Sequence, residues 1–191
     1  MPTAPTPVVL EGRLVRLEPL STAHVPALFA AGGRDEEVWR HLSAPTPQTE
    51  DDLRAIVTAR LADAARGHRL PLAVLDRAST AAIGTTNLHS WDVRTGRIEI
   101  GGSWLGRRWW RTGANREAKL LLMAHAFDTL GFTEIRWRVD AANTRSRQAV
   151  TRLGARPANP AAASSASHGL LHYTLPATTW PATRTRLTAD R

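Results

Sequence analysis

The sequence predicts an α/β fold in which helices cover a β-sheet. Apolar and polar side chains alternate around Ile135, Trp137 and Val139, which is the period of a half-buried strand. From Leu53 to Leu61 the apolar side chains recur every three or four residues, which is the period of an amphipathic helix. Because such strands and helices alternate along the centre of the chain, the pattern is typical of a layered α/β domain.

Most of the expected elements have a local start or stop signal. Pro19 ends the first strand, Ser21 or Thr22 can cap the first helix, and Thr49 can cap the second, which Gly67 follows. The expected strands are residues 13–18, 70–75, 82–91, 98–105, 134–139, a short stretch near 155, and 169–175. The expected helices are residues 22–31, 49–66, 115–130 and 143–153.

Length and composition favour one domain. The chain has 191 residues and no internal repeat, so we expect a flexible lead at 1–10, one domain at 11–181 and a polar tail at 182–191 that frays. It contains no cysteine, which excludes disulfides, thiolate metal sites and a cysteine nucleophile. His168 and His172 are spaced like metal ligands but have no evident third ligand, so we expect no metal.

The formal net charge of +8 comes almost entirely from arginine, since Lys119 is the only lysine. These arginines are scattered, which favours a solvated surface over a nucleic-acid interface, so we expect no nucleic-acid partner. No apolar run is long enough to cross a bilayer, and no signal-peptide pattern begins the sequence. We therefore expect a cytoplasmic protein without a membrane partner, and the sequence is compatible with a homodimer.

The segment from Gly106 to Lys119 has the pattern of an anion site. It joins a strand to a buried helix, and Gly113 permits a tight turn with close approach of the backbone to a ligand. Backbone amides at 111–115 would then lie at a helix N-terminus, which suits a pyrophosphate. The positive charges nearby are Arg107, Arg108, Arg111 and Arg116. An ordinary strand–helix turn would give the same pattern.

Several stretches, in order, resemble the GNAT acetyltransferases, and in particular the branch that contains ribosomal-protein N-terminal acetyltransferases. They are Glu11–Leu20, Trp110–Lys119, His125–Phe127, Asp140–Ser146 and Arg152–Ala155. The resemblance implies the GNAT fold, with a mixed central sheet flanked by helices, and acetyl-CoA as co-substrate. It also implies transfer of an acetyl group to a primary amine by direct attack.

The resemblance implies that the loop Trp110–Asn115 holds the CoA pyrophosphate through its amides. Trp110, Arg111 and Asn115 stand where the family often has other residues, so side-chain contacts to phosphate do not follow from it. The residues expected to contact the cofactor are Arg111, Thr112, Gly113, Ala114, Asn115, Arg116, Asn143 and Ser146.

Ser146 and Glu99 are the candidates for acid–base chemistry. Ser146 begins an apolar stripe of the last expected helix, and the family pattern implies that it donates a proton to the CoA sulfur. Asn143 would bind the pantetheine arm or its phosphate. The alternative is structural, with Asn143 as N-cap and Ser146 as a small core residue. Glu99, on the strand before the loop, could be the general base if burial raises its pKa, or a solvated residue paired to Arg97 or Arg94.

The acceptor side departs from the family. The segment Pro157–His168 is short and rich in small residues where relatives have a charged hairpin. This favours a small-molecule amine, such as an aminoglycoside-type antibiotic, over a protein N-terminus. Trp39, Trp91 and Asp92 are the expected substrate-binding residues. Asp35, Glu36 and Glu37 could also face a cationic amine.

Three further functions remain open from the sequence alone. They are N-terminal acetylation of a protein or peptide, a non-catalytic acetyl-CoA sensor, and a basic nucleic-acid-binding protein. A sensor predicts cofactor binding without turnover, and a nucleic-acid-binding protein predicts an affinity that falls steeply with salt.

Overall fold

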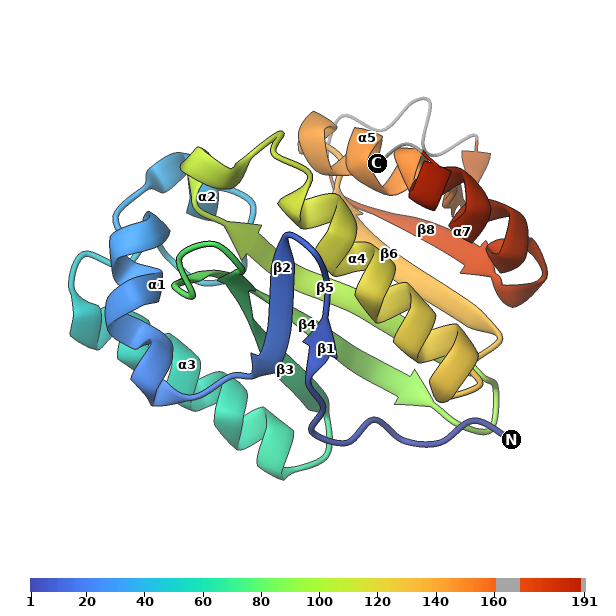
Figure 1. Cartoon of the computed structure of the whole chain (residues 1–191), viewed down its shortest axis with the longest axis horizontal. Coiled ribbons are helices and arrows are strands. Elements are labelled where there is room, and N and C mark those ends of the chain that lie inside the picture. Colours follow the sequence, from blue (N-terminus) through green and yellow to red (C-terminus); the bar gives the residue numbers. More distant parts are fainter. Residues whose placement is uncertain (161–168, 190–191) are drawn as a thin grey trace. The chain divides into compact units, whose positions relative to one another are not determined.

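The computed structural model describes residues 1–160 and 169–189, which form two compact units (Figure 1). The N-terminal unit contains residues 5–89 and 102–122. The C-terminal unit contains residues 1–4, 90–101 and the chain from Met123 onward. Residues 161–168, within the segment that departs from the family, lie outside the described part.

The strands form one hydrogen-bonded sheet in the order β1-β2-β3-β4-β5-β6-β8-β7. Their bounds are β1 (Leu10–Glu11), β2 (Val15–Pro19), β3 (Arg69–Asp76), β4 (Ala82–Asp92), β5 (Arg97–Leu105), β6 (Glu134–Asp140), β7 (Arg156–Pro157) and β8 (Leu170–Pro176). The β5–β6 pair is parallel, whereas β2–β3, β3–β4 and β6–β8 are antiparallel. The sheet is therefore mixed and flanked by helices, which confirms the predicted α/β class.

The helices lie close to the expected positions, with some additions. Their bounds are η1 (Thr22–His24), α1 (Val25–Gly32), α2 (Glu36–Trp39), α3 (Glu50–Ala65), η2 (Arg107–Trp109), α4 (Ala114–Ala124), η3 (His125–Thr129), α5 (Thr144–Arg152), η4 (Ala177–Thr179) and α7 (Trp180–Ala189). The elements α2, η2, η4 and α7 were not expected from the sequence.

Two adjacent threonines of β4 show how the N-terminal unit is layered. Thr85 accepts a hydrogen bond of 2.9 Å from Arg60 of α3, and Thr86 accepts one of 3.2 Å from Lys119 of α4. Because successive side chains of a strand point to opposite faces, α3 and α4 cover opposite faces of this unit's strands.

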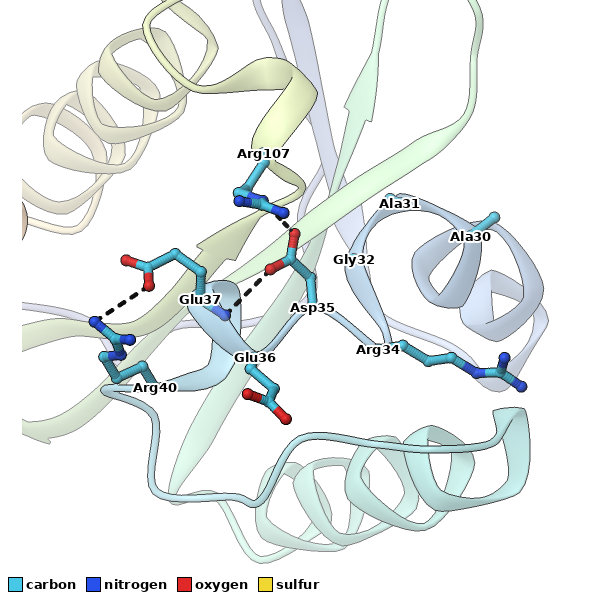
Figure 2. A pocket seen from close by; sticks show the side chains of 9 residues that line it. All are labelled: Ala30, Ala31, Gly32, Arg34, Asp35, Glu36, Glu37, Arg40 and Arg107. Carbon is cyan, nitrogen blue, oxygen red and sulfur yellow. Dashed lines mark hydrogen bonds and ion pairs between the residues drawn. The ribbon is translucent and has the colours of Figure 1, made fainter.

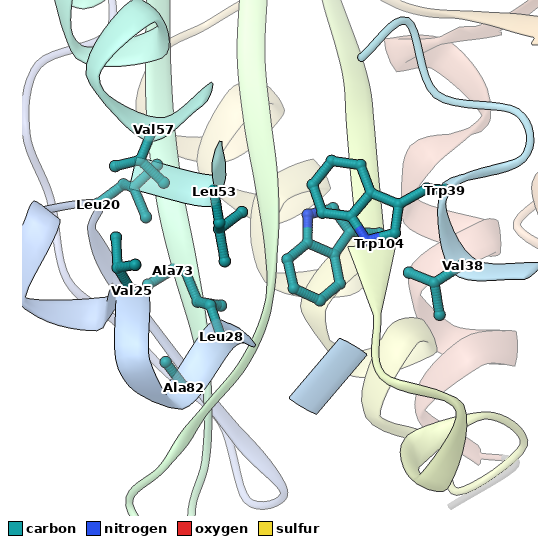
Figure 3. Packing of buried hydrophobic residues seen from close by; sticks show 10 residues of the cluster. All are labelled: Leu20, Val25, Leu28, Val38, Trp39, Leu53, Val57, Ala73, Ala82 and Trp104. Atoms are coloured by element: carbon teal, nitrogen blue, oxygen red, sulfur yellow. The ribbon is translucent and has the colours of Figure 1, made fainter. Parts of the chain in front are cut away.

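The largest side chains of the N-terminal core are two tryptophans (Figure 3). The rings of Trp39 and Trp104 lie 5.3 Å apart, and Trp39 donates a 2.8 Å hydrogen bond from its indole N–H to the carbonyl of Gly32. Full burial of one such side chain contributes roughly 2–3 kcal/mol. The surrounding apolar residues are Leu20, Val25, Leu28, Val38, Leu53, Val57, Ala73 and Ala82.

Two of the predicted helix starts are confirmed by their caps. The Thr49 hydroxyl accepts from the Asp52 amide at 3.1 Å, and the Asp52 carboxylate accepts from the Thr49 amide at 2.9 Å. This reciprocal pair satisfies amides that the helix cannot satisfy itself. At the start of α5, the Asn143 side-chain oxygen accepts from the Ser146 amide at 3.0 Å.

In the C-terminal unit, β6 lies between β5 and β8. Ile135 pairs with Ile98 in the parallel register and with Leu175 in the antiparallel one. The helical run expected at 115–130 changes at Ala124 into the π-helical turn η3, which Leu130 closes by donating its amide to the His125 carbonyl at 2.9 Å.

Helix α7 occupies the stretch in which the sequence analysis expected a frayed tail. It forms because Trp180, Thr183 and Leu187 recur at helical spacing and are all buried. Trp180 also donates a 2.8 Å hydrogen bond to Asp128, and its ring lies 5.5 Å from that of Phe127. Tertiary packing therefore orders residues whose composition alone is polar.

Candidate cofactor and active site

The loop between β5 and α4 has an unusual backbone path. Arg111 and Gly113 both have positive φ, at 64° and 93°. Between them, the Thr112 hydroxyl donates to the Trp109 carbonyl at 2.8 Å, which ties the loop to the end of η2. These two left-handed residues reverse the chain sharply into α4, in the way that the sequence predicted for Gly113.

The same loop places the first amides of α4 at an exposed helix end. The Glu117 amide donates to the Gly113 carbonyl at 2.9 Å, and the Ala114 amide donates to the Thr112 hydroxyl at 3.4 Å. The first amides of α4 therefore lie at a helix N-terminus, where acceptors come from outside the helix. Arg111, Thr112 and Asn115 are exposed, whereas the Ala114 side chain is buried beneath the loop. The positive helix end suits a pyrophosphate that is bound through backbone amides. Arg108 and Arg111 are close to it in the sequence, whereas Arg107 is ion-paired to Asp35.

Glu117 joins this helix to the first hairpin, a role that the sequence analysis missed. Its buried carboxylate accepts from the amides of Leu14 and Val15 at 2.6 and 2.9 Å. A side chain at Gly12 would come within 2.5 Å of the same carboxylate, so the glycine leaves room for it. The sequence did contain a signal for this role, because a glutamate in the first turn of a buried helix must find a hydrogen-bond donor within the protein.

Replacing Glu117 by alanine should lower the free energy of unfolding by roughly 2–4 kcal/mol, because two amides, one of them fully buried, lose a charged acceptor. Urea denaturation measures the loss. Glu117→Gln keeps an oxygen acceptor and should lose less. Glu50→Ala, at an exposed position of α3, should change stability little. A Glu117→Ala variant as stable as the wild type would contradict the anchoring role.

Lys119 is also unaccounted for by the sequence analysis. Its side chain is 6% exposed, and its ammonium donates to the hydroxyls of Thr86 (3.2 Å) and Ser103. Those two hydroxyls are also hydrogen-bonded to each other at 2.8 Å. Burial lowers the pKa of Lys119 to about 7, because the charged form loses its hydration. The sequence signal was its spacing to Leu122 and Met123, which places it on the buried stripe of α4.

Glu99 lies on β5 in the C-terminal unit and is half-buried. Its carboxylate accepts a 2.8 Å hydrogen bond from Arg138 on the neighbouring strand β6. The structural alternative stated from the sequence paired Glu99 with Arg97 or Arg94. Arg97 instead lies 3.6 Å from Glu134. The role of Glu99 as general base stays a prediction, now for a carboxylate that is held by a guanidinium.

Asn143 and Ser146 lie together at the start of α5. The cap described above engages the amide of Ser146, so its hydroxyl is not required for capping. Ser146 is half-buried, and Val150 and Leu153 continue the stripe inward as expected. The structural role of Asn143 is confirmed, whereas the contacts of both side chains with CoA stay predictions.

The expected acceptor residues have different surroundings. Trp39 is only 2% exposed and packs on Trp104, so the structure gives it a role in the core instead of on a substrate wall. Trp91 is half-buried at the end of β4. Asp92 is exposed and accepts from the amides of Arg94 (2.8 Å) and Thr95 (3.3 Å). A hydrogen bond from the Thr95 side chain, and after it the one from the Arg94 amide, hold the pKa of Asp92 below its usual range.

A pocket of about 600 Å³ lies in the N-terminal unit (Figure 2). Asp35 forms an ion pair of 2.5 Å with Arg107, and Glu37 forms one of 3.2 Å with Arg40. The residues that line the pocket are Ala30, Ala31, Gly32, Arg34, Asp35, Glu36, Glu37, Arg40 and Arg107. The three acidic residues singled out from the sequence therefore share one hollow with Arg107 of η2, at the start of the cofactor segment.

The described part of the chain contains neither a cluster of metal-ligating side chains nor a helix that could span a membrane. Across residues 1–160 and 169–189, no group of three or more His, Asp or Glu side chains is placed to hold a metal ion. In the same described part of the chain, no helix combines the length and apolar character needed to cross a membrane.

Comparison with known proteins identifies the family. Residues 14–156 match the family model described as "Acetyltransferase (GNAT) domain". No curated protein matches the chain.

Three solved structures share the fold. A GCN5-related N-acetyltransferase from Brucella melitensis is 28% identical, with a TM-score of 0.88 over 98% of this chain and 87% of that one. A protein from T. thermophilus that is assigned as an acetyltransferase is 32% identical, with a TM-score of 0.84 over 97% and 98%. RimJ of Mycobacterium smegmatis in complex with CoA-disulfide is 18% identical, with a TM-score of 0.78 over 96% and 95%, and shows the fold alone. The chain therefore belongs to the GNAT acetyltransferase family and is an acyltransferase.

Proposed function

We propose that this protein transfers the acetyl group of acetyl-CoA to a primary amine of a small molecule, of the kind found in aminoglycoside antibiotics. The observation that carries the cofactor part is the loop with two left-handed residues, Arg111 and Gly113, which opens the N-terminus of α4 to an anion. The acceptor part depends on the altered segment from Pro157, because the three carboxylates of the pocket are balanced by Arg34, Arg40 and Arg107.

Each chemical task has a residue in this proposal. The amides at the start of α4 bind the pyrophosphate, and Asn143 holds the pantetheine arm. The bound cofactor supplies the acetyl thioester. Glu99 takes a proton from the attacking nitrogen, and Ser146 gives a proton to the departing sulfur. No covalent enzyme intermediate is needed, because the amine attacks the thioester carbon directly.

A second candidate function is acetylation of a protein N-terminus. It is favoured by the resemblance of residues 11–155 to ribosomal-protein N-terminal acetyltransferases and by the fold shared with RimJ. The altered segment from Pro157 argues against it, because relatives place a charged hairpin there. We further propose that the protein acts in the cytoplasm, without nucleic-acid or membrane partners.

Thiol release from acetyl-CoA tests the proposal directly. A thiol-reactive dye suits a chain without cysteine, since the protein itself gives no signal. Aminoglycosides, polyamines and N-terminal peptides form the acceptor panel. Release that depends on an aminoglycoside supports the first function, and release that depends on a peptide supports the second. If no acceptor causes thiol release but acetyl-CoA still raises the melting temperature, a non-catalytic sensor is favoured.

Ser146→Ala and Glu99→Gln should each lower kcat by about 100-fold or more, because each removes a proton-transfer group. Their matched controls are Thr151→Ala on the same helix and Glu134→Gln on β6, another ion-paired carboxylate, and both should leave kcat unchanged. Steady-state kinetics with the best acceptor measures the effect. Equal kcat in test and control variants would remove both residues from the mechanism.

A further inference from the structure

The single lysine of the chain is placed in an unusual way for a charged residue. Lys119 reaches from α4 toward β4 and β5, and its ammonium group is buried in the N-terminal unit. A buried lysine is ordinarily paired with a carboxylate, because the bare charge is costly to desolvate. Among the described residues, both hydrogen-bond partners of Lys119 are neutral hydroxyls, those of Thr86 and Ser103.

The described groups that face the lysine from the neighbouring strands do not hold it protonated. The groups that β4 and β5 present to it are Thr86 and Ser103, and neither titrates in the physiological range. On its own helix, the buried Glu117 is turned to the amides of Leu14 and Val15. Burial therefore lowers the pKa of Lys119 to about 7, and at higher pH the nitrogen is a neutral amine with a lone pair.

Lys119, Thr86 and Ser103 are hydrogen-bonded to one another, and Ser103 is the least buried of the three. Thr86 is 1% exposed and Lys119 is 6% exposed, whereas Ser103 is half-buried. A proton that leaves or reaches the lysine nitrogen thus passes most directly through the Ser103 hydroxyl. A hydroxyl can do this, because it donates one hydrogen bond while it accepts another.

Ser103 lies on β5, the strand that precedes the cofactor loop, directly after a residue with a left-handed backbone. Its neighbour Gly102 has a φ of 56°, and the Asn87 side chain donates to the Gly102 carbonyl at 3.2 Å. The strand then runs through Leu105 into the loop whose far end begins α4, the helix that carries Lys119. The hydrogen bond between Lys119 and Ser103 therefore joins the helix that follows the proposed cofactor loop to the strand that precedes it.

We propose that Lys119, acting through the Ser103 hydroxyl, takes the proton that converts the acceptor ammonium into the attacking amine. This rests on the acetyltransferase function proposed above. The ammonium N–H gives its proton to the Ser103 oxygen while the Ser103 proton passes to the lysine nitrogen, which becomes an ammonium. The neutral amine then forms the N–C bond as the C–S bond breaks. The remaining proton of the nitrogen and the proton that the thiolate takes up belong to the later steps proposed above, so Lys119 acts on the first proton alone.

The first test is the pH dependence of kcat at saturating amine. In the wild type, kcat should rise with pH with a midpoint near 7, as Lys119 becomes neutral. Ser103→Ala interrupts the proton path, and Lys119→Met removes the group that receives the proton. In both variants the midpoint near pH 7 should disappear, and kcat at pH 8 should fall by at least about 10-fold. Ser103→Ala leaves the lysine in place, which keeps the test valid if the Lys119 variant folds poorly.

Thr85→Val is the matched control. It removes a hydroxyl that is as buried as that of its β4 neighbour Thr86, but one that faces Arg60 on the opposite side of the sheet. Its pH profile should keep the midpoint near 7. The same profile in Ser103→Ala or Lys119→Met as in the wild type would overturn the relay while leaving the acetyltransferase function intact.

The second test does not depend on activity. Because the chain has one lysine, isotope-labelled lysine gives a single side-chain signal in NMR, and its titration reports the pKa of Lys119 directly. A midpoint near 7 supports the relay, and a nitrogen that stays protonated above pH 9 overturns it. If the wild type turns over no amine while Lys119 still titrates near 7, the proposed function fails, and the relay fails with it for lack of a reaction.

Discussion

Replacing Lys119 by methionine is expected to stabilise the folded protein by about 3–5 kcal/mol at pH 6. The pKa of Lys119 is about 7 in the folded state against 10.5 for an ordinary lysine. Below pH 7 both states are protonated, and the folded state carries the full cost of a buried ammonium. Methionine has a similar shape and no charge, and the Thr86 and Ser103 hydroxyls keep each other as partners at 2.8 Å.

The sign of the pH dependence follows from the same pKa values. Between pH 7 and 10.5 the unfolded chain binds more protons at Lys119 than the folded one, so the stability of the wild type rises with pH. The advantage of Lys119→Met should therefore shrink by about 3 kcal/mol from pH 6 to pH 9. Urea denaturation of both proteins at the two pH values measures this narrowing.

Arg54→Met is the control for this measurement, since it removes an exposed cation from α3. Its effect on stability should be small and should not vary with pH. If Lys119→Met is less stable than the wild type at pH 6, or if the difference is constant with pH, the lysine is not buried as a poorly solvated amine in solution.

The sequence predicted those parts of the fold that local chemistry controls. Thr49 and Asn143 cap their helices as expected, because a side-chain oxygen before an apolar stripe is sufficient to start the helix there. The turn at Gly113 was predicted for a similar reason, since only a residue that tolerates positive φ reverses the chain so tightly. The strands were visible in the alternation of apolar residues.

The parts that were missed depend on partners far along the chain. Arg138 meets Glu99 only because β5 and β6 lie parallel in one particular register, which no local pattern encodes. Helix α7 requires Asp128 and Phe127 as partners for Trp180. Whether Trp39 packs in the core or lines a cleft is likewise decided by Trp104, which lies far away in the sequence. Composition could not distinguish these outcomes.

Gly113→Val is expected to weaken acetyl-CoA binding by at least about 100-fold while the protein stays folded. Residue 113 has a φ of 93°, which a β-branched residue does not adopt without strain, and an added Cβ would lie 3.1 Å from the Leu14 side chain. The loop must therefore move, and it takes with it the first amides of α4. Calorimetric titration with acetyl-CoA measures the loss.

The control for Gly113→Val needs the same backbone strain away from the loop, and Gly67 provides it. Gly67 has a φ of 75° in the same unit, and an added Cβ there meets nothing within 4 Å. Gly67→Val should lose roughly 1–3 kcal/mol of stability and bind acetyl-CoA like the wild type. If both variants bind equally well, the cofactor does not depend on the path of this loop. If only Gly113→Val fails, the affinity depends on the path of this loop, which places both the first amides of α4 and Arg111.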